Sequence, residues 1–277
     1  MRHQITNHGF IAPRITSDNY VLGSSIVPRD ILQADRQWIK SLPSNEKQAN
    51  ETYDPNGCTI WGTLNAIEML VKKTTGVEEN YADILIYILS RTEPPGNDPH
   101  EVAETIRKNG LVLETDLPFT PDLDSLSKIY LLEKRVQSLL PKALEWLSKY
   151  SFLHEYVFNT NIPFHVKKAK LIDALQLSPI CVSVRAWLQR ENGLYYKDIG
   201  DADTHWCVCV GYKEGEYWII FDSYPTSEGE YIKKLEWDYD FGFAKRYYLS
   251  PRPVNQGTNG WWKSIINFIK GIFTKHI

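Results

Sequence analysis

The sequence predicts an α+β fold in which most of the helices precede most of the strands. Between residues 59 and 176, apolar residues recur at spacings of three and four, which is the period of helices buried on one face. After Pro179 the pattern changes to short runs of β-branched and aromatic residues between turn residues, which is typical of strands. A block of helices followed by a block of strands indicates α+β rather than alternating α/β.

The helical block follows an N-terminal segment, residues 1–45, that we expect to be extended or irregular because prolines interrupt it. The first helix starts directly after a turn cluster of Asp, Pro, Asn and Gly at residues 54–57. We expect helices at residues 59–73, 80–90, 101–109, 126–150 and 168–176, with a proline-rich loop at 92–99 and a break in the fourth helix at Pro141.

The second block predicts strands at residues 180–185, 206–212, 216–222, 230–237 and 245–249. Residues 251–260 are rich in Pro, Gly and Asn and are predicted to be a linker. Residues 261–277 carry aromatic and aliphatic residues on one helical face and lysines mostly on the other, which predicts a basic amphipathic helix. Such a helix suits a membrane surface or a partner protein, and docking on the protein's own surface is the alternative.

Composition excludes several classes of protein. The formal net charge of −3 over 277 residues gives no general signal for binding nucleic acid. There is no apolar run long enough for a membrane-spanning helix, and the first twenty residues lack the features of a secretory signal. The four cysteines (Cys58, Cys181, Cys207 and Cys209) do not resemble a disulfide framework, so we expect free thiols and a reducing compartment.

Three residues carry the chemistry that we predict. Cys58 stands at the start of the first helix, where the positive end of the helix dipole favours a thiolate nucleophile. His205 begins a strand far downstream, and Asp222 ends the next strand. If these two strands form a hairpin, Asp222 can accept a hydrogen bond from one ring nitrogen of His205 while the other nitrogen faces Cys58. This order of residues is that of a nucleophilic Cys–His pair.

At this point the chain resembles the papain-like cysteine peptidases. The stretch NGCTIW around Cys58 looks like the nucleophile segment of that family, and GLVLETDLPF, residues 110–119, is similar to its mid-domain segment. Residues 175–199 resemble the strand and loop that precede the family's histidine strand, and THWCVCVGYKEGEYWIIFDSY, residues 204–224, resembles its histidine strand and the strand after it. The resemblance spans about residues 35 to 250 and rests on the collinear order of these segments.

The resemblance implies a domain at residues 1–250 with a helical half, an antiparallel β-barrel-like half and a cleft between them. It implies Cys58 as nucleophile, His205 as general acid and base, and Asp222 as the residue that orients His205, where the family mostly has asparagine. Gln48 would supply the side-chain donor to the oxyanion, although it lies further upstream than usual, and Asn50 and Asn56 are rivals for that role. Trp187 and Trp206 would line the cleft, or alternatively pack in the core.

Three departures from the family favour a cytoplasmic or virion-associated, divergent member that resembles those found in phage and prokaryotes. The 57 residues before Cys58 are too few for the family's propeptide and mature start, the usual disulfides are not supported, and Tyr224 stands where tryptophan is usual. We expect no cofactor and no metal. Cys207 and Cys209 are alternate residues on one face of a strand, and such residues lie ~6.6 Å apart, which is too far for both sulfurs to bind one zinc ion. The remaining histidines (His3, His8, His100, His154, His165 and His276) are predicted to lie on the surface or in loops.

The predicted function is hydrolysis of peptide bonds in a protein or peptide substrate through a Cys58 thioester. Two alternatives stay open. The same three residues serve amidases and acyltransferases, for which peptidoglycan is a candidate substrate, and the fold could also be a catalytically idle structural or anchoring module.

Overall fold

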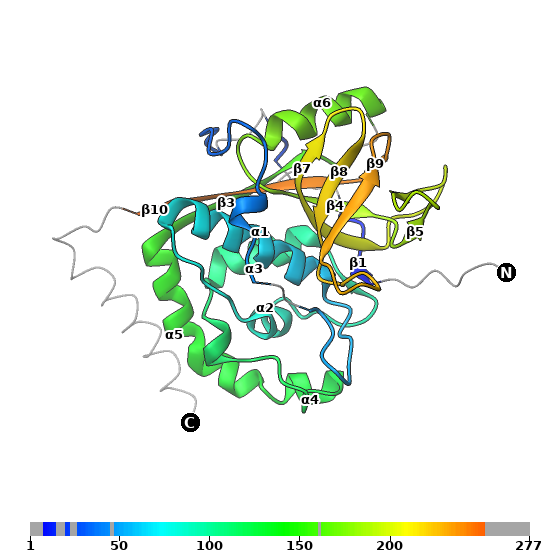
Figure 1. Ribbon diagram of the computed structural model, residues 1–277. Coiled ribbons are helices and arrows are strands. Elements are labelled where there is room, and N and C mark those ends of the chain that lie inside the picture. The colour runs from blue at the N-terminus through cyan, green and yellow to red at the C-terminus, as the bar shows by residue number, and fades with distance from the viewer. Residues whose placement is uncertain (1–7, 15–19, 23–26, 45–46, 160–161, 253–277) are drawn as a thin grey trace.

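The structure is a computed structural model that describes residues 8–14, 20–22, 27–44, 47–159 and 162–252. It confirms an α+β fold, with helices α1 to α5 gathered on one side and a large sheet on the other (Figure 1). The helices are α1 (Cys58–Thr75), α2 (Asp83–Leu89), α3 (Pro99–Asn109), α4 (Leu126–Tyr130), α5 (Glu133–Lys149) and α6 (Phe164–Ala174), and single 3₁₀ turns lie at Ile39–Ser41 and Glu114–Asp116.

The main sheet has eight strands in the order β3-β10-β4-β7-β8-β9-β6-β5. They are β3 (Tyr150–Phe158), β4 (Ile180–Val184), β5 (Leu188–Gln189), β6 (Tyr195–Tyr196), β7 (His205–Lys213), β8 (Tyr217–Phe221), β9 (Ile232–Glu236) and β10 (Ala244–Pro251). All neighbours pair antiparallel except β6 and β9, which are parallel. A separate two-stranded parallel sheet joins β1 (Gly9–Phe10) to β2 (Gly96–Asn97).

Helix α1 is the central element of the core. Its residues from Cys58 to Val71 are all buried, because α1 packs against α2 and α3 on one side and against β4, β7 and β10 on the other. A helix that is enclosed on all sides is apolar around most of its circumference, as this one is. Helix α6 packs against β3, and in Figure 1 it lies above the sheet, away from α1 to α5.

Strand β1 lies at the junction of the two halves. It contacts α1 and β2 on the helical side and β7 on the sheet side. The junction is therefore filled by residues from the N-terminal segment, which the sequence predicted to be extended or irregular.

The prediction of a helix break at Pro141 is wrong. Pro141 lies inside α5, and the interruption comes earlier, between α4 and α5. Pro141 and the residue whose carbonyl loses its partner, Gln137, are both exposed, so water can satisfy that carbonyl. Val136 and Ala143 are buried on either side of the proline and hold the helix in place.

Strand β3 was not predicted, because the fourth helix was expected to continue to residue 150. Its nine residues, YSFLHEYVF, instead pair with β10 along the length of the strand. β10 extends to Pro251, so the first residue of the predicted linker belongs to the sheet. The rest of that linker from residue 253 and the predicted helix at 261–277 lie outside the described residues.

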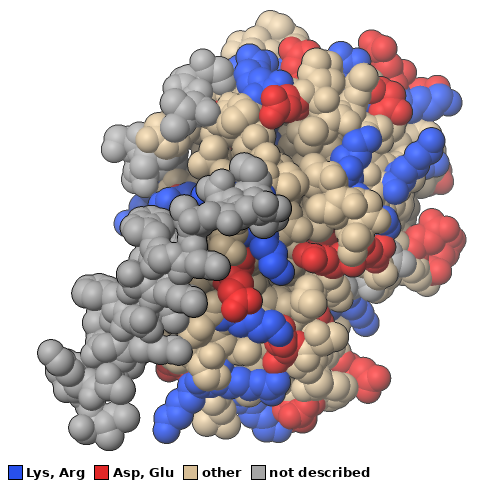
Figure 2. Space-filling view, turned by 90° about the vertical axis from the view of Figure 1, so that its left-hand side faces the viewer, with Lys and Arg blue, Asp and Glu red and all other residues tan. Residues whose placement is uncertain are grey.

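The surface seen in Figure 2 carries Lys and Arg side chains interspersed with Asp and Glu side chains. Over the part of the chain that the structure describes, no helix is long and apolar enough to cross a membrane.

Candidate active site

Cys58 is the first residue of α1 and follows a sharply turned segment. Asn56 adopts a left-handed conformation with φ of 54°, and Gly57 caps the helix. Only glycine fits at position 57, because a Cβ atom there would lie 2.4 Å from the ring of Trp61. The turn therefore delivers the Cys58 side chain to the junction of the two halves at the positive end of the helix dipole.

The Cys58 side chain is fully buried in this structure. Burial raises the pKa of the thiol well above its ordinary value, while a backbone hydrogen bond from Trp206 acts in the opposite direction and Asp222 raises the pKa further. Burial therefore opposes the effect of the helix terminus, which favours a thiolate.

His205 and Asp222 are in direct contact. The hairpin of β7 and β8 brings the first residue of one strand beside the residue that follows the other, as the sequence predicted. Nε2 of His205 lies 2.5 Å from Oδ1 of Asp222, and both side chains are fully buried. Burial alone would raise the pKa of the Asp222 carboxyl, but attraction to His205 and Lys233 outweighs it and lowers the pKa to about 2. Asp222 is therefore a carboxylate.

The second ring nitrogen of His205 is available for proton transfer. Nδ1 is buried and has no hydrogen-bond partner among the described residues. Since Nε2 faces Asp222, Nδ1 is the nitrogen that can exchange a proton with another group. Cys58 accepts a backbone hydrogen bond from Trp206, the chain neighbour of His205, which places the sulfur beside the start of β7.

Gln48 and Cys58 donate to one and the same oxygen atom. Nε2 of Gln48 lies 3.0 Å from the carbonyl oxygen of His8, and the backbone nitrogen of Cys58 lies 3.4 Å from it. Two convergent donors beside a nucleophile are the arrangement that stabilises the oxyanion of acyl-transfer chemistry. Gln48 is fully buried and its Oε1 accepts a hydrogen bond from Ser223 at 3.2 Å, so its amide is held in this orientation.

The rival residue Asn50 is used elsewhere. Its Nδ2 donates to the carbonyl oxygens of Thr120 and Leu123, and its Oδ1 accepts from the backbone of Thr52 and Tyr53. Asn50 therefore holds a loop together. Asn56 contributes its left-handed backbone to the turn before Cys58.

The oxygen between Gln48 and Cys58 belongs to an extended segment, residues 8–11, which we call the N-terminal strap. The backbone nitrogen of His8 donates to the carbonyl of Thr204 at 3.0 Å, and that of Ile11 donates to Asn97 at 3.0 Å. Gly9 has φ of 116° and a Cβ atom there would lie 2.0 Å from the carbonyl oxygen of Asn56, so only glycine fits. The site thus binds an extended peptide backbone through main-chain hydrogen bonds to both halves.

The strap also carries a side chain into the core. Phe10 is 4% exposed and stacks on Trp206 with ring centroids 5.6 Å apart and an interplanar angle of 2°. Trp206 itself is fully buried, so it packs in the core and one of its faces meets the strap. Trp187 contacts the candidate site directly, because the centroid of its ring lies 5.7 Å from that of the His205 ring.

The prediction that the remaining histidines lie on the surface or in loops is wrong for two of them, His100 and His154, while His8 lies in a segment without regular structure as predicted. His8 is in the strap, 5.6 Å from the ring of His205 and 4.9 Å from that of Tyr224. His100 of α3 and His154 of β3 are buried, with rings 5.4 Å apart. His154 is buried because β3 places it on the inner face of the strand, where its Nε2 lies 3.0 Å from Oε1 of Glu104. His165 is exposed on α6, and His3 and His276 lie outside the described residues.

Two residues of the site were missed by the sequence. Lys233 of β9 is buried and bonds Asp222, and Asp54 accepts hydrogen bonds from Gln48 and Tyr224. Lys233 left a signal in the sequence, because it shares the inner side of an alternating strand with Leu235, whereas Lys234 points outward. Asp54 left none beyond its place in the turn before Cys58.

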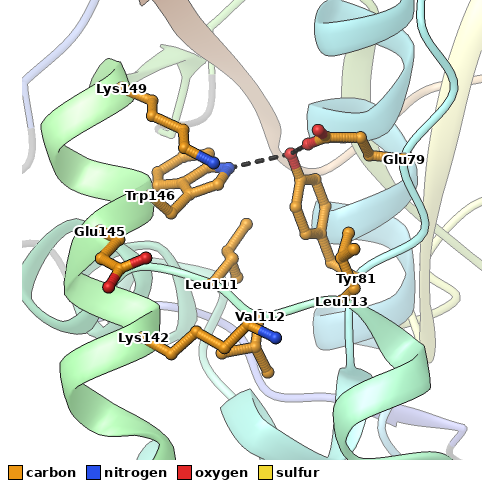
Figure 3. A pocket seen from close by; sticks show the side chains of 9 residues that line it. All are labelled: Glu79, Tyr81, Leu111, Val112, Leu113, Lys142, Glu145, Trp146 and Lys149. Atoms are coloured by element: carbon orange, nitrogen blue, oxygen red, sulfur yellow. Dashed lines mark hydrogen bonds between the residues drawn. The ribbon is translucent and has the colours of Figure 1, made fainter.

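All four cysteines are free and buried. Among the residues that the structure describes, no group of His, Cys, Asp and Glu side chains could hold a metal ion. A pocket between α5 and the segments at 79–81 and 111–113 is shown in Figure 3. It is lined by Lys142, Lys149 and Glu79 among others, and Trp146 donates to Tyr81 there at 2.9 Å, but it contains neither Cys nor His.

Comparison with known proteins places this geometry in a known fold. No protein-family model matches the chain, and no curated protein matches it. Solved structures do match. Xylellain, a cysteine protease from Xylella fastidiosa, is 14% identical, with 92% of this chain and 99% of that chain covered and a TM-score of 0.55.

Two further structures agree. The digestive procathepsin L 3 of Tenebrio molitor larval midgut is 15% identical over 90% of this chain and 77% of that chain, with a TM-score of 0.53. The Carica candamarcensis cysteine protease CMS1MS2, solved in complex with E-64, is 14% identical over 78% of this chain and 96% of that chain, with a TM-score of 0.53. The chain therefore has the α+β fold of the papain-like cysteine proteases.

Proposed function

We propose that this protein is a cysteine peptidase that hydrolyses peptide bonds through Cys58. The observation that supports the proposal best is the pair of donors from Gln48 and Cys58 on a single peptide carbonyl, that of His8. In that position the carbonyl oxygen of a substrate would lie beside the sulfur of Cys58, and the His205–Asp222 pair would lie within the same site.

The reaction would proceed in two halves. Nδ1 of His205 takes the proton of the Cys58 thiol, and the thiolate attacks the carbonyl carbon of the substrate. The oxyanion that forms is held by the Gln48 amide and the Cys58 backbone N–H. When the C–N bond breaks, His205 gives its proton to the leaving amine and a thioester remains. His205 then takes a proton from water, the hydroxide attacks the thioester, and the acid and the thiol are released.

Asp222 would keep Nε2 of His205 occupied throughout this cycle. A carboxylate at 2.5 Å fixes the orientation of the ring and occupies Nε2, so the proton is exchanged at Nδ1. Trp187 and Tyr224 flank the ring and limit its rotation, with centroids 5.7 and 5.4 Å from that of His205.

A peptide substrate is favoured over other amides because the site already accommodates main chain. The strap offers its backbone N–H groups to Thr204 and Asn97 on opposite halves, which is how an extended peptide is recognised irrespective of its side chains. An amidase or acyltransferase would use the same chemistry but would not need these two acceptors. A structural module would need none of these groups.

The experiment that tests the proposal is labelling with a thiol-alkylating probe. We expect one equivalent of label on Cys58, loss of label in Cys58→Ala, and strongly slowed labelling in His205→Ala. Cys209→Ala is a matched control, because that thiol is buried in β7 and donates to the carbonyl oxygen of Gly211 in the same strand. Equal labelling rates in the parent protein and His205→Ala would contradict the proposal that the protein is an enzyme. Digestion of a peptide library, read by mass spectrometry, then separates a peptidase from an amidase.

The segment at residues 261–277 stays a separate proposal. Its sequence suits a membrane surface or a partner protein. Flotation with anionic liposomes, with and without these residues, tests the membrane interaction, and equal flotation of the two proteins would contradict it.

A further inference from the structure

Asp222 uses both of its carboxylate oxygens, and only one of them serves His205. Oδ1 lies 2.5 Å from Nε2 of His205, and Oδ2 lies 2.7 Å from Nζ of Lys233. The side chain of Lys233 is 2% exposed and that of Asp222 is fully buried. Three buried groups thus form a line of alternating charge when His205 is protonated, with the carboxylate in the middle.

The register of the sheet puts Lys233 in this position. β8 and β9 pair antiparallel with Ile220 opposite Lys233, and Asp222 is two residues beyond Ile220 on the same side of its strand. Diagonal neighbours of this kind are within reach of a long side chain. Lys233 also donates to the backbone carbonyl of Tyr224, and its Nζ lies 5.0 Å from the ring centroid of Trp187. The ammonium group is therefore held on several sides.

A buried carboxylate without a second cation would hinder the proposed chemistry. The negative charge of Asp222 raises the pKa of the Cys58 thiol, and so disfavours the nucleophile. Most papain-like peptidases have a neutral amide at this position, which carries no such charge. A fixed ammonium group on the second oxygen cancels that charge while leaving the first oxygen as an acceptor.

We propose that Lys233 is a positioning residue that orients the Asp222 carboxylate and neutralises its charge, so that an aspartate acts toward His205 as a neutral acceptor would. The inference rests on the proposed function and names a residue that acts through Asp222. Among the described residues, Lys233 is the only Lys or Arg that forms an ion pair with Asp222.

Other titratable groups face the same site from several elements. The strap contributes His8, the turn before α1 contributes Asp54, and α1 contributes Cys58. Three further groups are Tyr195 of β6, Cys207 of β7 and Tyr224, which follows β8. None of these six is a permanent cation, so none can replace Lys233 as the partner of Asp222.

The test is a double-mutant cycle on the full chain, read by the pH dependence of Cys58 alkylation with iodoacetamide. The variants are Lys233→Met, Asp222→Asn and the combination of both. Lys234→Met is the matched control, because that neighbouring lysine is exposed on the other side of β9. His205→Ala is measured beside them, so that failure of the proposed function is seen separately as labelling that does not depend on His205.

We expect Lys233→Met to move the midpoint of the pH profile upward by about 1–3 units, because it leaves a buried carboxylate beside the site. We expect Asp222→Asn to move it downward, because it leaves a buried cation. The double variant should return the midpoint close to that of the parent protein, and Lys234→Met should not move it.

Two outcomes would overturn the proposal while His205 dependence is intact. One is slower labelling in Lys233→Met at every pH with an unchanged midpoint, which is the result for a residue that only supports the fold. The other is a double variant whose pH midpoint differs from that of the parent protein by as much as the midpoint of the more strongly shifted single variant. If Lys233→Met fails to fold, as judged by its thermal unfolding, the midpoint of the double variant decides alone, since a neutral pair of side chains should reproduce the parent profile.

Discussion

Phe10 lies flat against Trp206, with ring centroids 5.6 Å apart and planes inclined by 2°. This contact is the main apolar anchor of the strap, whose other attachments are backbone hydrogen bonds to Thr204, Asn97 and the Gln48–Cys58 donor pair. Under the proposed function, the carbonyl of His8 occupies the position that a substrate carbonyl would take, and a substrate would displace residues 8–11 before the reaction.

Phe10→Ala is expected to expose Cys58. Truncating a buried Phe costs about 3–5 kcal/mol where the side chain is fully packed, and here the loss falls on the attachment of a short segment. We expect alkylation of Cys58 to become roughly 10- to 100-fold faster, which corresponds to about 1.4–2.8 kcal/mol. Ile11→Ala is the control, because Ile11 is 39% exposed. Equal labelling rates in the parent protein and Phe10→Ala would show that the strap does not limit access.

Gln48→Ala is expected to lower kcat by about 100- to 1000-fold with little change in KM, since the loss of one oxyanion donor acts on the transition state. The measurement is steady-state kinetics on a peptide identified from the library digest. Asn50→Ala provides the comparison, because its side-chain bonds go to Thr120 and Leu123 and it should reduce stability more than kcat. A similar loss of kcat in both variants would argue against a specific role for the Gln48 amide.

The parts of this structure that the sequence predicts are those with long local patterns. The periodicity of α1 and the apolar run of β7 are strong enough to locate Cys58 and His205 at the ends of their elements. A hairpin between two strands is sufficient to bring Asp222 to His205. The position of Gln48 came from resemblance alone, because its contact with the His8 carbonyl spans a loop without a periodic pattern.

What the sequence does not predict depends on contacts between distant segments. β1 is two residues long, and it is specified by the close approach of Gly9 to Gly96 and to the turn before α1, which no local pattern reveals. The raised pKa of Cys58 follows from complete burial, to which the strap contributes. Strand β3 was hidden because apolar residues at helical spacing run directly into its alternating pattern at Tyr150.

The Asp222 carboxylate should make folding sensitive to acid. Its pKa is lowered from 3.8 to about 2 in the folded protein, so the unfolded chain binds a proton at a higher pH than the folded one. The stabilisation is complete above about pH 4 and is lost as the pH falls toward 2. We expect the loss of unfolding free energy between pH 7 and pH 3 to be about 1–2 kcal/mol smaller in Asp222→Asn than in the parent protein.

Urea denaturation at the two pH values measures this difference. Asp240→Asn serves as control, because the Asp240 side chain is 57% exposed, and its pairing with Lys167 should contribute little. An identical acid dependence in Asp222→Asn and the parent protein would contradict the lowered pKa of this carboxyl.

Lys245 is expected to destabilise the folded protein near neutral pH. It is fully buried in β10, its Nζ lies 3.9 Å from the ring centroid of Tyr156, and that nitrogen has no hydrogen-bond acceptor among the described residues. Burial lowers the pKa of the amine from 10.5 to about 7, against the opposing influence of Asp98 and Glu104. The unfolded chain therefore binds a proton between pH 7 and pH 10.5 that the folded protein does not hold, and stability rises with pH through this window.

Lys245→Met removes this penalty and keeps most of the volume of the side chain. We expect it to raise the free energy of unfolding at pH 6 by about 1–4 kcal/mol, with the gain shrinking as the pH approaches 10. Urea denaturation at pH 6 and pH 10 is the measurement, and the exposed Lys234→Met should show no comparable gain at either pH. A loss of stability in Lys245→Met that is the same at both pH values would mean that the ammonium group is well stabilised by the Tyr156 ring, and that burial does not lower the pKa of this lysine.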